Sequence, residues 1–149
     1  MTRTANDIKR ACAQALACKD FEPHDGLTFC NIALYDILSE LGIGKIIWNV
    51  PAKRVMLANE IADTLENTCR ELSMTEAALA ANSGRIVISA LKAPYHGHCA
   101  VIYPFPGLYT SGKWGRADVP CVANIGKDVG VMPLNWAFGA LPRLWLVDL

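Results

Sequence analysis

The feature that most constrains the fold is a change in the spacing of apolar residues near Gly84. Before Gly84 apolar residues recur every three or four positions, as on one face of a helix, whereas after it they form short β-branched runs. Helices followed by strands are typical of an α+β protein with helices packed on one face of an antiparallel sheet. No repeat or linker divides the chain, so residues 1–149 are expected to form one domain; whether the helix at about 7–18 is an extension of it stays open.

Local signals place the elements more closely. Ser73 and Glu76 form a capping-box pattern, and Thr28 and Gly42 are the expected N-cap and terminator of an earlier helix. The expected helices cover residues 7–18, 28–41, from near Pro51 to 69, and 74–82, with a further turn of helix at 135–138. The expected short strands cover residues 85–90, 98–103, 119–125, 130–133 and 144–147, with turns at 106–107 and 111–113.

Cys30 stands in the first turn of the helix expected at 28–41. The partial positive charge at a helix N-terminus lowers the pKa of a thiol, which makes Cys30 a candidate nucleophile. Cys30 also begins the apolar stripe of this helix, and free cysteines are often buried for packing alone. Both interpretations of Cys30 follow from the helix itself.

A thiol nucleophile needs a base, and the chain offers three histidines. His98 opens the strand expected at 98–103 directly after Gly97, where a rigid element would support its ring, whereas His96 lies in a turn and His24 in a loop. Asn124 is the polar residue within a later apolar strand and could orient the imidazole. The alternative for Asn124 is that it begins the turn completed by Gly126.

The order of these segments resembles the papain-like NlpC/P60 and CHAP group of cell-wall cysteine hydrolases. Cys30-Asn31 at a helix start is followed by residues 76–88, then by Gly97-His98-Cys99-Ala100-Val101-Ile102, then by residues 119–126 around Asn124. The resemblance runs from Cys30 to near Phe138, and its most specific part is the segment around His98. It implies a papain-like α+β fold with N-terminal helices packed on a short-stranded antiparallel sheet.

The same resemblance implies a thiol hydrolase that cleaves an amide bond in peptidoglycan, either within the stem peptide or between glycan and peptide. Cys30 would attack, His98 would transfer protons, and Asn124 would orient His98. Trp114, His96 and Tyr109 are candidates for substrate binding. Phe29 stands where several members carry Asp, and the tyrosine that several members place shortly before the nucleophile is absent, so the oxyanion hole would depend on backbone N–H groups at the start of the Cys30 helix.

Three alternatives use the same residues. The first is a binding module for cell wall or peptide, with Trp48, Trp114, Trp136 and Tyr109 forming the ligand surface. The second is an acyl transferase with the same Cys-His chemistry. The third is a zinc site, because His24, Cys30, His96, His98, Cys99 and Cys121 are zinc-type ligands, although no C-x-x-C or H-E-x-x-H spacing supports it. No cofactor or metal is expected.

Charge and hydropathy limit the classes of partner and the cellular location that the sequence allows. Fourteen basic residues balance fourteen acidic ones and form no basic cluster, which argues against nucleic acid. The polar start of the chain predicts no signal peptide, and no apolar run predicts a membrane span, so we expect synthesis in the cytoplasm and delivery to the cell wall or periplasm by another system. The expected partners are a peptidoglycan peptide or related amide and an immunity or inhibitor protein.

Overall fold

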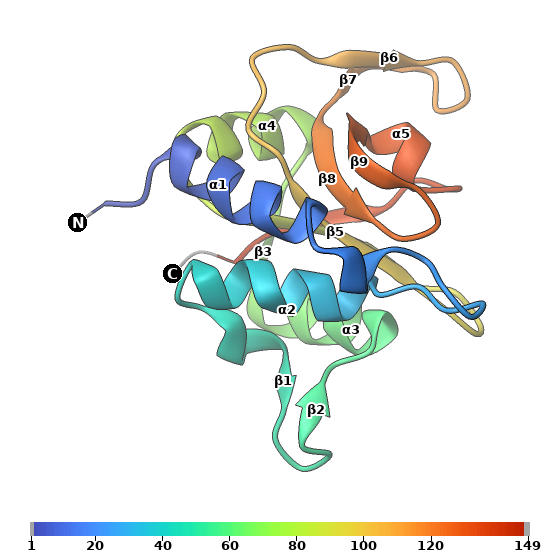
Figure 1. The fold of residues 1–149 in the computed structure, drawn as a ribbon. Coiled ribbons are helices and arrows are strands. Elements are labelled where there is room, and N and C mark those ends of the chain that lie inside the picture. Colours follow the sequence, from blue (N-terminus) through green and yellow to red (C-terminus); the bar gives the residue numbers. More distant parts are fainter. Residues whose placement is uncertain (1, 148–149) are drawn as a thin grey trace.

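A six-stranded antiparallel sheet forms the centre of the molecule (Figure 1). The computed structural model describes residues 2–147, so Met1, Asp148 and Leu149 of the predicted single domain lie outside the described residues. The strand order is β3-β10-β4-β5-β8-β9. The strands are β3 Arg70–Glu71, β4 Val87–Leu91, β5 His98–Ile102, β8 Cys121–Ile125, β9 Val129–Pro133 and β10 Arg143–Leu146. The predicted α+β class and antiparallel pairing are confirmed.

Helices cover both faces of this sheet, so the expectation of helices on one face is wrong. One face packs against α1 Ala5–Leu16, α2 Cys30–Glu40 and α3 Ala58–Thr68, with short 3₁₀ helices at Lys19–Phe21 and Gly44–Ile47. The other packs against α4 Met74–Asn82, α5 Leu134–Ala137 and a hairpin of β6 Tyr109–Ser111 and β7 Arg116–Val119. The reason lies in the central strands: adjacent residues such as Val101 and Ile102 are both buried, one in each core, so neither face can remain open to water.

Helix ends marked by local side-chain chemistry lie close to their predicted positions. The capping box of α4 is present, since the Glu76 carboxylate accepts from the Ser73 backbone N–H and the Ser73 hydroxyl accepts from the Glu76 N–H. Gly42 and Gly84 follow α2 and α4 with φ of +85° and +88°, the left-handed conformation that ends a helix. These predictions succeeded because each signal acts within a few residues.

The helix predicted to begin near Pro51 begins instead at Ala58. The preceding residues form a hairpin in which β1 Trp48–Asn49 pairs with β2 Arg54–Val55. The Asn49 side chain accepts a hydrogen bond of 3.1 Å from the backbone N–H of Ala52, which stabilises the turn and stops a helix from forming there. This hairpin projects from the body of the molecule (Figure 1).

The strand predicted at 119–125 is divided between two sheets. Val119 ends β7 and Cys121 begins β8, because Pro120 between them has no N–H to donate to a strand ladder. The predicted turn at 111–113 connects β6 and β7, a hairpin that the sequence patterns did not show as strands.

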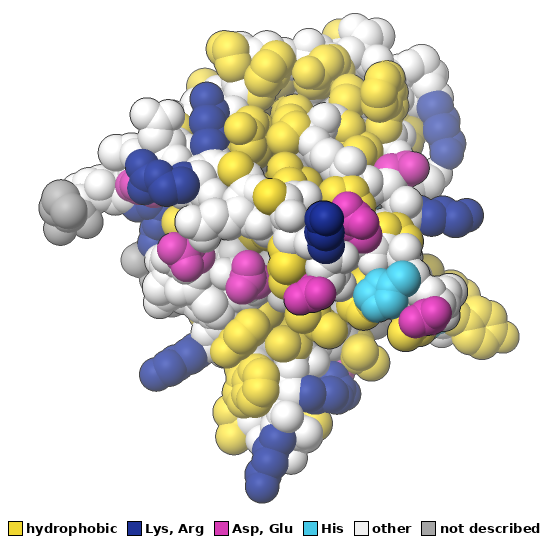
Figure 2. All heavy atoms as spheres, viewed as in Figure 1, with side chains coloured by type: hydrophobic (Ala, Val, Ile, Leu, Met, Phe, Trp, Pro, Cys, Tyr) yellow, Lys and Arg dark blue, Asp and Glu magenta, His cyan; other side chains and the backbone are white. Residues whose placement is uncertain are grey.

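No helix among residues 2–147 is long and apolar enough to cross a membrane. The face in Figure 2 carries lysine and arginine side chains mostly as scattered single groups, with acidic side chains between them. Apolar side chains gather on this face near the β6–β7 hairpin and near the β1–β2 hairpin.

Candidate active site

Cys30 is the first residue of α2, and its side chain is half-buried. The predicted N-cap at Thr28 is wrong: Phe29 is the N-cap, and no side chain caps this end. The ring of Phe29 stacks on His24 with centroids 4.7 Å apart.

The start of α2 differs from the starts of the other long helices. In α1, α3 and α4 the third residue is Asp7, Glu60 or Glu76, whose carboxylate accepts the N-cap backbone N–H at 2.8, 2.8 and 3.0 Å. In α2 the third residue is Ile32, whose side chain has no hydrogen-bond acceptor for the N-cap N–H. The partial positive charge at this helix end is therefore not neutralised by such a carboxylate, and Cys30 lies within it.

His98 and Asn124 come from the neighbouring strands β5 and β8. Nε2 of His98 lies 2.6 Å from Oδ1 of Asn124, and Nδ2 of Asn124 donates to the carbonyl of Asp128 at 2.8 Å. The second bond fixes the amide so that its oxygen faces the ring, and Nε2 must therefore carry the proton. Nδ1 remains as the ring atom that can hydrogen-bond Cys30, the contact through which the pKa values of the two side chains are linked.

The ring of His98 is held by packing as well as by hydrogen bonds. Phe138 lies against it with ring centroids 4.8 Å apart. A Cβ at Gly126 would lie 3.0 Å from Cε1 of the ring, so the backbone also approaches it closely. The imidazole is therefore confined between a ring and a backbone segment, as a proton-transfer group must be.

Cys99 adds a second donor that the sequence patterns did not reveal. Its thiol and backbone N–H lie beside the Cys30 sulfur and lower the pKa of Cys30, and its side chain is 1% exposed. Cys99 follows His98 in β5 and belongs to the core beneath α2. Its proximity to Cys30 could have been predicted only by knowing which face of β5 meets α2. Of the two cysteines, Cys30 lies beside the His98 imidazole and is more exposed than Cys99, so Cys30 is the one that carries the thiolate.

These contacts set the charge states of the site. Hydrogen bonds from the Cys99 thiol and from His98, with the positive charge of His98, hold the pKa of Cys30 far below that of an ordinary thiol, although burial acts against them. Burial also favours the neutral form of His98, but the hydrogen bond and charge of Cys30 outweigh it and raise the pKa of His98. A thiolate beside an imidazolium is the expected state near neutral pH.

Gly97 lets the chain approach α3 just before His98. A Cβ at this position would lie 2.8 Å from the carbonyl oxygen of Leu91 and would also collide with Oδ1 of Asn59. That oxygen accepts the backbone N–H of Ala93 at 3.2 Å, so it cannot move away without losing a bond.

We therefore expect Gly97→Ala to lower the free energy of unfolding by about 1–3 kcal/mol, because the added methyl group forces apart backbone and side-chain atoms. Urea unfolding measures the change. Gly112→Ala is the matched control, since a Cβ there meets nothing within 4 Å, and it should leave stability nearly unchanged. Equal stabilities of the two variants would contradict the close packing described for Gly97.

A pocket of about 310 Å³ opens beside Cys30. It lies between the first residues of α2, the first residues of α3 and the loop 95–97. Its lining residues are Thr28, Cys30, Asn31, Leu57, Ala58, Asn59, Glu60, Tyr95, His96 and Gly97. His96, a substrate-binding candidate from the sequence, is thus placed at this pocket.

The other two substrate-binding candidates lie elsewhere. Tyr109 and Trp114 belong to the β6–β7 hairpin region and pack against the core on the face opposite α2. Tyr109 stacks on Phe105 with ring centroids 5.6 Å apart. Neither residue lines the pocket beside Cys30. Among residues 2–147, no group of three or more His, Cys, Asp or Glu side chains is arranged to hold a metal ion.

Comparison with known proteins adds no family assignment. No protein-family model matches the chain, and no curated protein shows significant sequence similarity to it.

Proposed function

We propose that this chain is a cysteine hydrolase of the papain-like α+β type that cleaves an amide bond in peptidoglycan. The observation that carries the proposal is the arrangement of Cys30 beside His98, whose ring is in turn hydrogen-bonded to Asn124. A thiolate, a proton donor and an orienting amide are the three groups that nucleophilic cleavage of an amide requires. The peptidoglycan substrate comes from the resemblance of the segments around Cys30, His98 and Asn124.

In the proposed reaction, the Cys30 sulfur attacks the carbonyl carbon and forms a tetrahedral intermediate. Free backbone N–H groups in the first turn of α2 stabilise its oxyanion. His98 gives the proton on Nδ1 to the leaving amine, the C–N bond breaks, and a thioester remains on Cys30. His98 then takes a proton from water, hydroxide attacks the thioester, and the acid leaves as the thiolate is restored.

Asn124→Ala is expected to lower the turnover number by about 10²-fold, the scale of effect from slight misplacement of a reacting group. The ring of His98 would lose the acceptor on Nε2 and could adopt the other tautomer, while Cys30 and its helix stay in place. Steady-state assays on a soluble peptidoglycan fragment measure this, with KM expected to change less than kcat. An unchanged kcat would show that the hydrogen bond between Asn124 and His98 has no part in catalysis.

The proposal is tested by incubating the wild-type protein with purified peptidoglycan and counting new amino groups over time. Amines should increase steadily, and prior alkylation with iodoacetamide should stop their release. Binding to the cell wall without amine release would favour the binding-module alternative. Transfer of the acyl group to an added amine, with no hydrolysis in water alone, would favour the acyl transferase.

A further inference from the structure

The pocket beside Cys30 lies on a defined side of the proposed reaction. Cys30 lines this pocket, but His98 does not. Because His98 gives its proton to the leaving amine, the amine must lie on the side of His98. The pocket, which Cys30 lines and His98 does not, is then the place for the acyl part of the substrate. This step rests on the proposed function.

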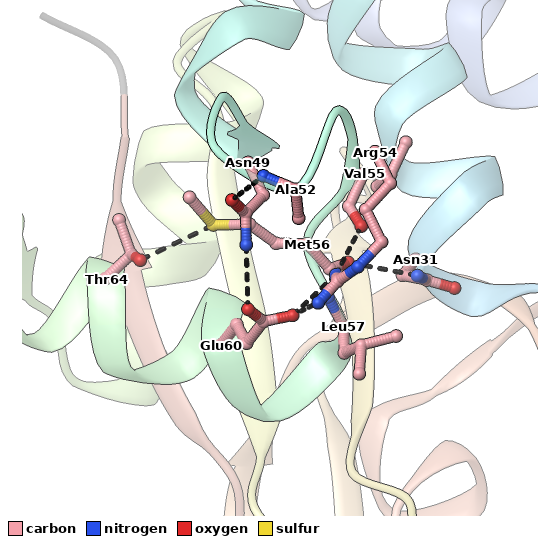
Figure 3. Close-up of polar contacts among 9 residues, drawn as sticks. All are labelled: Asn31, Asn49, Ala52, Arg54, Val55, Met56, Leu57, Glu60 and Thr64. Carbon is pink, nitrogen blue, oxygen red and sulfur yellow. Dashed lines mark hydrogen bonds and ion pairs between the residues drawn. The ribbon is translucent and has the colours of Figure 1, made fainter.

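The one carboxylate among the lining residues of the pocket is already paired. Oε1 of Glu60 accepts from Nη1 of Arg54 at 2.7 Å and from the backbone N–H of Leu57 at 2.8 Å, and Oε2 accepts from Nδ2 of Asn49 at 3.0 Å (Figure 3). The Arg54 hydrogen bond is the main cause that lowers the pKa of Glu60, so the group stays ionised and balanced by the guanidinium. Glu60 thus ties the β1–β2 hairpin to α3 instead of offering a free charge.

The amide side chains of the pocket are also engaged. Nδ2 of Asn31 donates to the carbonyl of Met56 at 3.0 Å, which joins α2 to the segment after the hairpin (Figure 3). Asn59 donates to the carbonyl of Ala93 at 2.7 Å and accepts the N–H of the same residue. A cationic substrate side chain entering here would lose water without gaining a free carboxylate, and no lysine or arginine lines the pocket for an anionic one.

Two of the side chains that line the pocket are large, mostly apolar and exposed. Leu57 is 54% exposed and Tyr95 is 92% exposed, although both are residues that water normally drives to the interior. The two side chains come from the start of α3 and from the loop before Gly97. An apolar substrate group between them would remove exposed apolar surface from water, which is favourable.

We propose that this pocket is the acyl-side subsite, that it accepts an uncharged side chain, and that Leu57 and Tyr95 determine this specificity. The residue that supplies the scissile carbonyl is accordingly neutral. The subsite is built by the hydrogen bonds that hold the β1–β2 hairpin, α2 and α3 together in Figure 3.

The test uses N-acetyl amino acid chloromethyl ketones, which place a chosen side chain on the acyl side while the Cys30 sulfur displaces chloride. Probes with leucine, lysine and glutamate side chains are compared, each relative to iodoacetamide, which reports the reactivity of the thiolate alone. The leucine probe should alkylate Cys30 on the order of 10-fold faster than the two charged probes, the scale of discrimination by an apolar pocket. Mass spectrometry of the labelled peptide gives the rates.

The charge-changing variant Leu57→Asp sharpens the test. Leu57 is the N-cap of α3, a position where Asp is favoured, so folding should be retained. The new carboxylate should shift the preference toward the lysine probe by about 10-fold, while Leu108→Asp, an exposed leucine before β6, should leave the preference unchanged.

Equal relative rates for the three probes, or an unchanged preference in Leu57→Asp, would overturn the assignment of the pocket. So would reaction of Cys30 with iodoacetamide but with none of the ketones. Selectivity among the probes without amine release from peptidoglycan would instead count against the proposed hydrolysis and leave the uncharged pocket standing.

Discussion

Cys30→Ala is expected to abolish the release of amines from peptidoglycan, with a loss on the order of 10⁶-fold in turnover. The variant removes the atom that forms the thioester, and Cys99 cannot replace it, because its side chain is only 1% exposed and burial alone keeps its thiol protonated. Residual binding to the substrate should remain, because the pocket is otherwise intact. Amine release and pull-down of peptidoglycan measure the two properties separately.

Cys18→Ala is the matched control, because Cys18 is also a partly exposed free thiol but lies after α1, outside the proposed site. It should retain full activity. Amine release by Cys30→Ala at more than about 1% of the wild-type rate would be incompatible with covalent catalysis by this residue.

His98→Ala is expected to reduce turnover by about 10⁴-fold to 10⁶-fold. Without the ring, the thiolate loses a hydrogen bond and the imidazolium charge, and the leaving amine has no proton donor. Cys30 should still react slowly with iodoacetamide, which separates the loss of proton transfer from the loss of the nucleophile. Single-turnover kinetics on a peptidoglycan fragment measure acylation, and circular dichroism verifies that the fold is retained.

His24→Ala provides the comparison among the histidines. His24 is exposed, its ring stacks on Phe29, and its Nδ1 lies 2.8 Å from the carbonyl of Glu22. We expect its replacement to change turnover by less than about 10-fold, because it takes part in no step of the reaction. Comparable losses in His24→Ala and His98→Ala would contradict the choice of base.

Much of the fold could be predicted where the signal lies within a few residues of the element. The capping box at Ser73 and the glycine at position 84 gave the limits of α4 because their contacts are local. The start of α2 and the β1–β2 hairpin could not be predicted in the same way. No side chain caps the start of α2, and the hairpin depends on Glu60 reaching from α3 to Asn49 and Arg54, contacts between segments that periodicity does not describe.

The candidate site shows the same division. Cys30, His98 and Asn124 were predicted from residue type and from their places at the start of a helix and within strands, and the structure brings the three together. Cys99 and Leu57 were missed because their relation to Cys30 depends on which face of β5 meets α2 and on the start of α3. Trp114 and Tyr109 were predicted to bind substrate because they are aromatic residues near turns, but they pack against the core on the opposite face of the sheet.

The pH dependence of Cys30 alkylation shows whether the Cys30 thiolate is stabilised by His98 and Cys99. A lowered pKa means that the sulfur loses its proton at lower pH, so thiolate is present at neutral pH and disappears only as the solution becomes acidic. The rate with iodoacetamide, assigned to Cys30 by peptide mass spectrometry, should therefore be near its plateau at neutral pH and fall only in acid. A rate that rises with a midpoint near the free-thiol value of about 8.5 would contradict the account.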